Sequence, residues 1–296
     1  MATLLKSASI DSIDRPLAGV AWMLLAQFCF AVMGVAGRVS SSVAPWQEVL
    51  LVRFVAGAFA AWLLARLRNV PLVIVDKRAQ FGRSFFGTVA ALGTFYLLAA
   101  RQMPLGDAVT LFAVSPLLVA VLSWPVLGER VTKRSALAIV VGFAGVVAIA
   151  KPSFQTAPVL VLIGFVTAAS TAIAMMWLRR MGSSERGEAI VFNFSIFGAV
   201  VALVSALPIL TWPKGYGLLW LCLTGLTGGL GQLCMTKAYS LAQAARVSAV
   251  TSTGIVMTRI LALVVFFEVP TFWQWAGTAL VLFATAAVAS SGILKK

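Results

Sequence analysis

The feature that most constrains this chain is a series of long apolar runs separated by short segments that hold most of the charges. A helix that crosses the hydrocarbon of a bilayer needs roughly 20 predominantly apolar residues. With 61% hydrophobic and 11% charged residues, the chain is also more apolar than soluble domains of its size. Barrel strands would instead alternate in segments of about ten residues. We therefore predict an all-α integral membrane protein with ten transmembrane helices, at residues 17–37, 45–65, 81–100, 105–127, 135–150, 158–178, 189–210, 216–238, 247–267 and 273–294.

The placement of the basic residues predicts which way the helices run. The formal net charge is +14, which is also typical of a protein that binds nucleic acid. With the N-terminus in the cytoplasm, however, 17 of the 23 basic residues, Arg83 among them, fall in inside segments. A nucleic-acid-binding face would not alternate sides from one segment to the next. Both termini are therefore predicted to be cytoplasmic, and the outside segments hold only Arg38, Arg101, Lys151 and Lys214.

The chain contains a weak internal repeat. Glu48 and Arg53 open the second run, and Glu188 and Asn193 take the same places in the seventh. Each half would contain five crossings, and because five is odd, the second half must enter the membrane from the opposite side. Inverted repeats of this kind are typical of transporters. The predicted organisation is a cytoplasmic tail at 1–16, a first five-helix repeat at 17–151 and a second at 157–294.

The cysteine and histidine content argues against a metal site or a catalytic centre. Cys29, Cys222 and Cys234 lie in apolar runs at spacings that match no metal motif, and the chain has no histidine. We therefore expect no metal, no cofactor and no catalytic residues. An intramembrane enzyme would need a nucleophile with a base, or a ligand cluster, at membrane depth. A channel or receptor is the other alternative, but no charged ring or filter motif is visible.

Several short motifs occur in order along both halves. They are Arg53, Ala-Ala-Arg-Gln-Met-Pro-Leu-Gly-Asp-Ala at 99–108, Leu-Gly-Glu at 127–129, Lys-Ala-Tyr-Ser-Leu-Ala at 237–242 and Trp-Gln-Trp-Ala-Gly at 273–277. Together they make the chain resemble the EamA type of the drug/metabolite transporter superfamily. The resemblance implies a central cavity lined by the first, third, fourth, sixth, eighth and ninth helices.

The resemblance also implies a function. It predicts a secondary transporter that moves a small organic metabolite across a bacterial inner membrane by alternating access. The solute would be an amino acid or related compound, and the Pro-Leu-Gly-Asp-Ala stretch adds S-adenosylmethionine-like compounds to the candidates. The expected partners are this small-molecule substrate and the lipid bilayer, without nucleic acid. Both a monomer and a homodimer are compatible with the sequence.

Ionisable and helix-breaking residues inside the apolar runs are the first candidates for function. Arg53 is interpreted as a buried tie, paired with Glu48 or with backbone carbonyls, or as an anion-binding residue. Arg259, near the middle of the ninth run, could dock a carboxylate or phosphate or form a salt bridge. Pro116 interrupts the fourth run, as discontinuous helices at binding sites do. The predicted structural or gating residues are Arg53, Pro116 and Asn193.

The predicted substrate-binding residues combine polar groups with aromatic and thioether side chains on the six cavity helices, because solute pockets are mostly apolar with a few placed polar groups. Ordinary helix packing is the alternative for each of them. They are Gln27, Phe30, Met33, Tyr96, Ser115, Ser170, Met175, Trp177, Gln232, Tyr239, Thr253 and Arg259.

Overall fold

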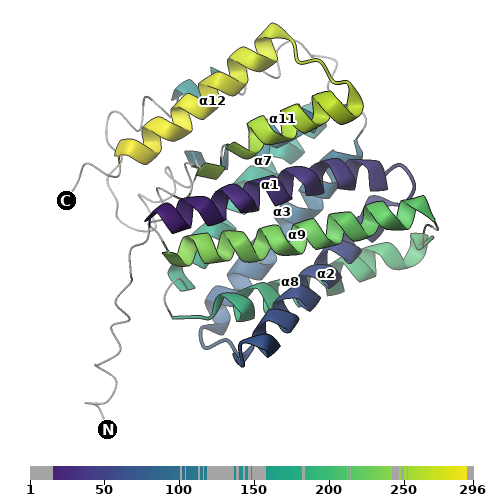
Figure 1. Ribbon diagram of the computed structural model, residues 1–296. Helices are drawn as coiled ribbons and strands as arrows, with labels where there is room; N and C mark the ends of the chain where they lie inside the picture. The colour runs from purple at the N-terminus through teal and green to yellow at the C-terminus, as the bar shows by residue number, and fades with distance from the viewer. Residues whose placement is uncertain are drawn as a thin grey trace.

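The computed structural model shows a bundle of helices (Figure 1). It describes residues 16–100, 102–103, 105–112, 114–115, 117–118, 137, 140–142, 144–145, 148, 158–181, 184–211, 213, 215–241, 247, 250–251 and 253–291. The helices are α1 (Pro16–Ser40), α2 (Trp46–Leu67), α3 (Lys77–Ala99), α4 (Leu105–Phe112), α7 (Pro158–Met181), α8 (Gly187–Ala206), the short 3₁₀ helix η2 (Leu207–Ile209), α9 (Tyr216–Leu241), α11 (Thr253–Phe266) and α12 (Phe272–Ser291).

The described part of the chain is all-α, as predicted. Five of its helical segments are long and apolar enough to cross a bilayer, and α11 and α12 supply shorter apolar stretches. Much of the predicted helices at 105–127 and 135–150 lies outside the described residues. The number of ten spans therefore stays a prediction. The five long segments are Leu17–Ser40, Trp46–Leu67, Pro158–Leu178, Gly187–Ile209 and Tyr216–Leu241.

Helix ends follow local capping chemistry. The Asp76 carboxylate caps α3 by accepting a hydrogen bond from the Ala79 amide at 2.9 Å. Because of this cap α3 begins at Lys77, four residues before the predicted start. Thr271 and Gln274 form a reciprocal capping box at α12: the Gln274 side chain accepts from the Thr271 amide at 2.8 Å, and the Thr271 hydroxyl accepts from the Gln274 amide at 3.4 Å.

The main helix contacts join one half of the chain to the other. α1 packs against α9, α3 against α7, and α2 against α8; α1 and α9 lie side by side in Figure 1. If the halves are exchanged, so that α1 corresponds to α7 and α3 to α9, the α1–α9 contact becomes the α7–α3 contact. The α1–α11 and α4–α7 contacts are related in the same way. This reciprocity is what two structurally equivalent halves produce.

The crossing of α2 and α8 joins equivalent helices of the two halves. Phe54 of α2 and Phe194 of α8, which occupy equivalent places in the two halves, meet edge to face with ring centroids 5.4 Å apart. The glycine at position 198 leaves room for this contact, because a Cβ there would overlap the Phe54 ring. Both rings are buried and belong to the largest apolar cluster. The crossing therefore holds the two halves together through an aromatic pair.

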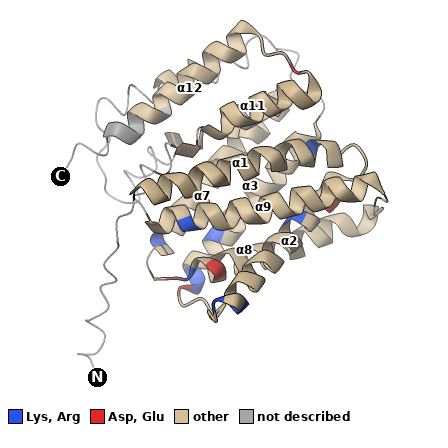
Figure 2. Cartoon of the chain, in the orientation of Figure 1, with Lys and Arg blue, Asp and Glu red and all other residues tan. Residues whose placement is uncertain are grey.

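The charged residues lie mostly toward the helix ends. In Figure 2 the long middle stretches of most helices carry no charge, and both signs gather near the ends of α2 and α8. Such a pattern suits helices whose middle sections face hydrocarbon or each other. The few charged side chains that do lie inside the bundle are therefore of particular interest.

Candidate functional site

Arg53 is buried in the interior of the bundle, where it joins three helices. Its Nη2 donates a hydrogen bond to Oε1 of Gln232 on α9 at 3.2 Å. Its guanidinium carbon lies 4.7 Å from the centre of the Phe54 ring and 5.6 Å from that of Phe194 on α8. The predicted role as a buried tie therefore has a structural basis, but the expected partner was wrong. Glu48 instead accepts hydrogen bonds from the amide and hydroxyl of Thr211.

A second arginine, Arg83 of α3, meets the same aromatic ring. Its guanidinium carbon lies 4.2 Å from the centre of the Phe194 ring, and the residue is 2% exposed. Gly87, one turn further along α3, leaves the space that the guanidinium occupies, since a Cβ there would overlap Nη1. Two cationic side chains from the first half therefore converge on one phenyl ring of the second half.

The sequence analysis counts Arg83 among the charges of an inside segment, and the structure shows that its side chain is buried within the bundle. The burial was missed because Arg83 was grouped with Lys77 and Arg78, although Arg83 already lies within the predicted helix at 81–100. A signal was available in the spacing of Arg83, Gly87 and Ala90, which places all three on one helix face. Their shared burial confirms that this face points into the bundle.

Several predicted site residues on α1 and α9 do come together. A Cβ at Gly228 would lie 2.9 Å from the sulfur of Met33 and 3.0 Å from Cγ of Arg53, and one at Gly231 would lie 2.9 Å from the Phe30 ring. The small residues of α9 thus let these side chains pack against its backbone. Gln27 is buried; it contacts Gly254 of α11 and donates a hydrogen bond to the Met23 sulfur at 3.4 Å.

On the other side of the bundle, Trp177 of α7 packs on the α3 backbone. A Cβ at Gly82, the residue before Arg83, would lie 2.6 Å from the Trp177 indole. Met175 and Tyr239 each pack against two apolar clusters, one that contains Met235 and one that contains Met181. Ser170 is also buried on α7. These residues line the interface between α7, α9 and α3.

The remaining predicted residues lie on other segments or outside the described residues. Tyr96 is 40% exposed and meets Trp46 edge to face at 5.9 Å. Arg259 is buried in α11, and the Thr253 hydroxyl donates to the Val250 carbonyl at 2.7 Å. Ser115 is partly buried, whereas its neighbour Pro116 lies outside the described residues.

Asn193, at the place in the second half that corresponds to Arg53, also forms hydrogen bonds to another segment. Its side-chain nitrogen donates to the carbonyls of Leu72 at 3.1 Å and Ala189 at 2.9 Å. It therefore ties α8 to the segment before α3 without a charge.

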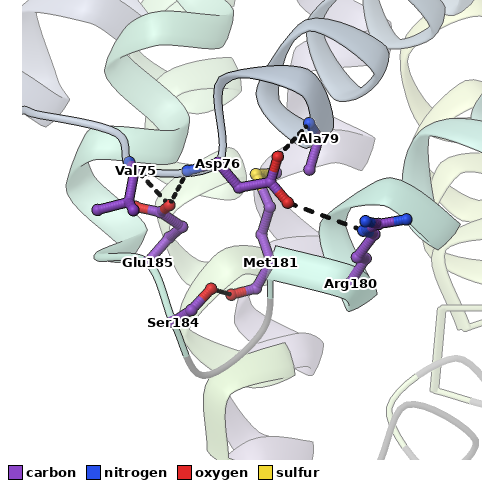
Figure 3. A network of polar contacts seen from close by, with 7 residues as sticks. All are labelled: Val75, Asp76, Ala79, Arg180, Met181, Ser184 and Glu185. Carbon is purple, nitrogen blue, oxygen red and sulfur yellow. Dashed lines mark hydrogen bonds and ion pairs between the residues drawn. The ribbon is translucent and has the colours of Figure 1, made fainter. Parts of the chain in front are cut away.

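A polar network joins the helix ends predicted to face the cytoplasm (Figure 3). Glu185 accepts hydrogen bonds from the backbone amides of Val75 at 2.9 Å and Asp76 at 2.8 Å. Asp76 lies 3.7 Å from Nε of Arg180, which also lies 5.6 Å from the centre of a Trp177 ring. Nearby, Arg68 and Glu188 pair at 2.9 Å. This inner network links the segment before α3 to the segment before α8.

A second network joins helix ends predicted to face outward. Arg38 at the end of α1 donates to the Met103 carbonyl at 2.9 Å and lies 3.7 Å from Glu268, just after α11. Glu268 also accepts from the Leu105 amide at the start of α4, at 3.0 Å. This outer network, like the inner one, connects only segments that the positive-inside pattern puts on one side.

The interior of the described part of the chain contains groups that can bind a solute. The described residues contain no cluster of three or more potential metal ligands from cysteine and acidic side chains. The buried polar groups are guanidinium, carboxamide and hydroxyl groups, set among thioether and aromatic side chains. Such a set can hold and orient a solute through hydrogen bonds, charge and apolar contact.

Comparison with known proteins identifies the class of molecule. The EamA-like transporter family model matches residues 17–151 and 158–290, one match for each half. The pseudopaline exporter CntI of Pseudomonas aeruginosa is 28% identical over 280 residues, which cover 93% of this chain and 97% of the exporter. An uncharacterized transporter of Helicobacter pylori is 25% identical over 292 residues, covering 95% and 97% of the two chains.

Similarity extends to eukaryotic proteins and to a solved structure. Mouse solute carrier family 35 member G1 is 28% identical over 223 residues, or 69% of this chain and 60% of the carrier. A crystal structure with 17% sequence identity superposes with a TM-score of 0.70, covering 94% of this chain and 99% of that one, and so shares the fold. These relatives are transporters and not enzymes. Because the family model covers both halves, this multi-pass membrane protein belongs to the EamA-like transporter family, in the drug/metabolite transporter superfamily that its motifs predict.

Proposed function

We propose that the chain is a secondary transporter that moves a small organic metabolite across a bacterial inner membrane by alternating access. The proposal includes ten spans in two inverted repeats, with both termini in the cytoplasm. It is supported above all by the reciprocal contacts of the two halves, α1 with α9 and α3 with α7. Inverted repeats that pack in this way can rock about a site shared between them.

In this proposal the inner and outer polar networks close the two ends of the bundle in turn. The inner network depends on Asp76 and Arg180, and the outer one on Arg38 and Glu268. Alternating access requires that one layer of contacts opens while the other stays closed. Both networks connect helix ends across the halves, and both use partly exposed ion pairs that can exchange with water at modest cost.

The proposed solute site lies between these networks. We place the solute against the side chains that the structure brings together on α1, α7 and α9, with Arg53 and Gln232 supplying polar contacts. The proposed site is completed by further contacts on α11, after the end of α4 and on α3, from Arg259, Thr253, Ser115 and Tyr96. The solute is an amino acid or a related metabolite, and S-adenosylmethionine-like compounds are included. The exporter CntI supports outward movement of a metabolite.

Transport by the purified protein is the direct test. Proteoliposomes preloaded with amino acids, nucleosides or S-adenosylmethionine would be assayed for counterflow of the labelled compound. We expect at least one compound to exchange, and Gln232→Leu to reduce its rate at least tenfold by removing the Arg53 partner. Leu226→Val, at a position on the same helix that is 56% exposed, is the matched control and should retain the wild-type rate. Failure of every compound in the panel would contradict the proposal.

A further inference from the structure

The two arginines at the Phe194 ring pose a problem of charge balance. A guanidinium is ionised under all physiological conditions, and removing an ion from water costs several kcal/mol even after the protein relaxes. Arg53 and Arg83 are 6% and 2% exposed. Contact with an aromatic face offsets only part of this cost. Buried cations of this kind are normally balanced by a carboxylate.

No carboxylate balances them within the described part of the chain. Its ion pairs use Arg38, Arg68 and Arg180, and the acidic partners are Glu268, Glu188 and Asp76. Glu48 and Glu185 are committed to Thr211 and to the amides of Val75 and Asp76. Neither Arg53 nor Arg83 takes part in any of these contacts.

Arg83 has fewer hydrogen-bond partners than Arg53. Arg53 has the Gln232 hydrogen bond, whereas Arg83 makes no hydrogen bond to any described residue, and its Nε is fully buried without an acceptor. A guanidinium has five N–H donors in a rigid planar fork that matches an oxyanion. A buried donor without a partner destabilises the fold, so the retention of Arg83 calls for an explanation.

The charges also break the pseudo-symmetry of the two halves. Asn193 takes the place of Arg53, and counting from the equivalent glycines Gly87 and Gly228, Thr224 takes the place of Arg83. Both replacements are uncharged, and both find ordinary partners: Asn193 bonds to carbonyls, and the Thr224 hydroxyl to the Trp220 carbonyl at 2.8 Å. The fold therefore needs no cation at these two places.

We propose that Arg83, with Arg53 beside it, binds an oxyanion of the transported solute, a carboxylate or a phosphate. This inference rests on the proposed function and specifies the chemical class of its substrate. The anion completes the hydrogen bonds of Arg83 and balances two positive charges in a medium of low dielectric constant. Its site lies close to the inner network, because Trp177 packs on Gly82, the residue before Arg83, and its ring centre also lies 5.6 Å from the Arg180 guanidinium carbon. Opening of the Asp76–Arg180 contact would give it access from the cytoplasm.

Anion binding can be measured without transport. The full-length protein in neutral detergent would be titrated with sodium succinate or inorganic phosphate, with sodium chloride keeping the ionic strength constant. A ligand that binds the folded state raises its apparent stability, so we expect a saturable rise in apparent Tm of roughly 2–4 °C. The probe that acts at the lower concentration distinguishes a carboxylate from a phosphate. No rise with either probe would overturn the proposal.

Three variants separate binding from a packing role. Arg83→Met should abolish the rise while leaving the apparent Tm in anion-free buffer unchanged or higher, because an unbalanced buried charge has been removed. Arg83→Lys keeps the charge without the fork and should need at least tenfold more anion. Arg66→Gln, an exposed change on α2, should behave as wild type. A lower Tm for Arg83→Met without anion, together with an unchanged rise, would make Arg83 a packing residue.

The transport assay then distinguishes the two proposals. Anion binding that depends on Arg83, without exchange of any solute, would contradict the proposed function and leave the anion site in place. Exchange of a solute at the wild-type rate by Arg83→Met would contradict the anion site and leave the transporter function in place. If Arg83→Met does not fold, Arg83→Lys decides: an unchanged dependence on anion concentration overturns the proposal.

Discussion

Arg38 and Glu268 pair at 3.7 Å across the outer end of the bundle, although 230 positions of sequence separate them. Their side chains are 13% and 23% exposed, so water screens the pair only in part. Each has a second partner in the same network, the Met103 carbonyl and the Leu105 amide. The ends of α1, α4 and α11 are thereby joined by one carboxylate and one guanidinium.

Neutralising this pair should weaken the outer closure. We expect Glu268→Gln to lower the free energy of unfolding by about 1–3 kcal/mol, between the values for exposed and buried pairs. A double-mutant cycle with Arg38→Met, measured by chemical unfolding in detergent, isolates the pairwise term. Additive effects of the two changes would show that the pair contributes no coupling.

The predicted sidedness can be tested with two serines. In a background without Cys29, Cys222 and Cys234, Ser42→Cys in the α1–α2 linker should react with an impermeant maleimide added to intact cells. Ser184→Cys in the α7–α8 linker should react only after the membrane is permeabilised. Both positions are exposed, so protection would reflect the membrane and not burial. Labelling of both in intact cells would contradict the inverted arrangement.

The α2–α8 crossing should not tolerate a methyl group at Gly198. Gly198→Ala would overlap the Phe54 ring, and overpacking of this kind typically costs about 1–3 kcal/mol. The expected result is a lower apparent Tm. Gly34→Ala is the matched control: a Cβ there meets only Leu105 at 4.0 Å, and alanine is the better helix former. Equal effects of the two changes would contradict the close approach at Gly198.

Asp76 has two roles that two substitutions can separate. Asp76→Ala removes both the cap on α3 and the contact with Arg180, and should cost about 1 kcal/mol. Asp76→Asn keeps a capping oxygen and loses only the ion pair, whose arginine side chain is 64% exposed, so it should cost less than about 0.5 kcal/mol. Apparent Tm values measured at low salt compare them. An equal loss in the two variants would instead make the ion pair, and not the cap, the main contribution of Asp76.

The sequence by itself determined the class of the protein and the positions of its described helices. The apolar side chains of runs such as 17–37 and 216–238 are unfavourable in water and favour the hydrocarbon of a bilayer. In hydrocarbon, a helix is the structure that pairs the backbone hydrogen-bonding groups within one segment. The alternation of basic segments and the Glu48–Arg53 and Glu188–Asn193 correspondence predicted two related halves. These signals are local or periodic, so they can be seen without knowing which helix packs on which.

Only the tertiary structure decided which side chains meet. The Arg53–Gln232 bond links positions 179 apart, and helix periodicity carries no information on a contact between segments so distant. The sequence groups Arg83 with the charges of an inside segment. The structure shows that α3 begins after the cap at Asp76, and that the packing of α3 on α7 and α8 buries the Arg83 side chain. Burial depends on what the neighbouring helices bring to a place, and no single segment of sequence contains that information.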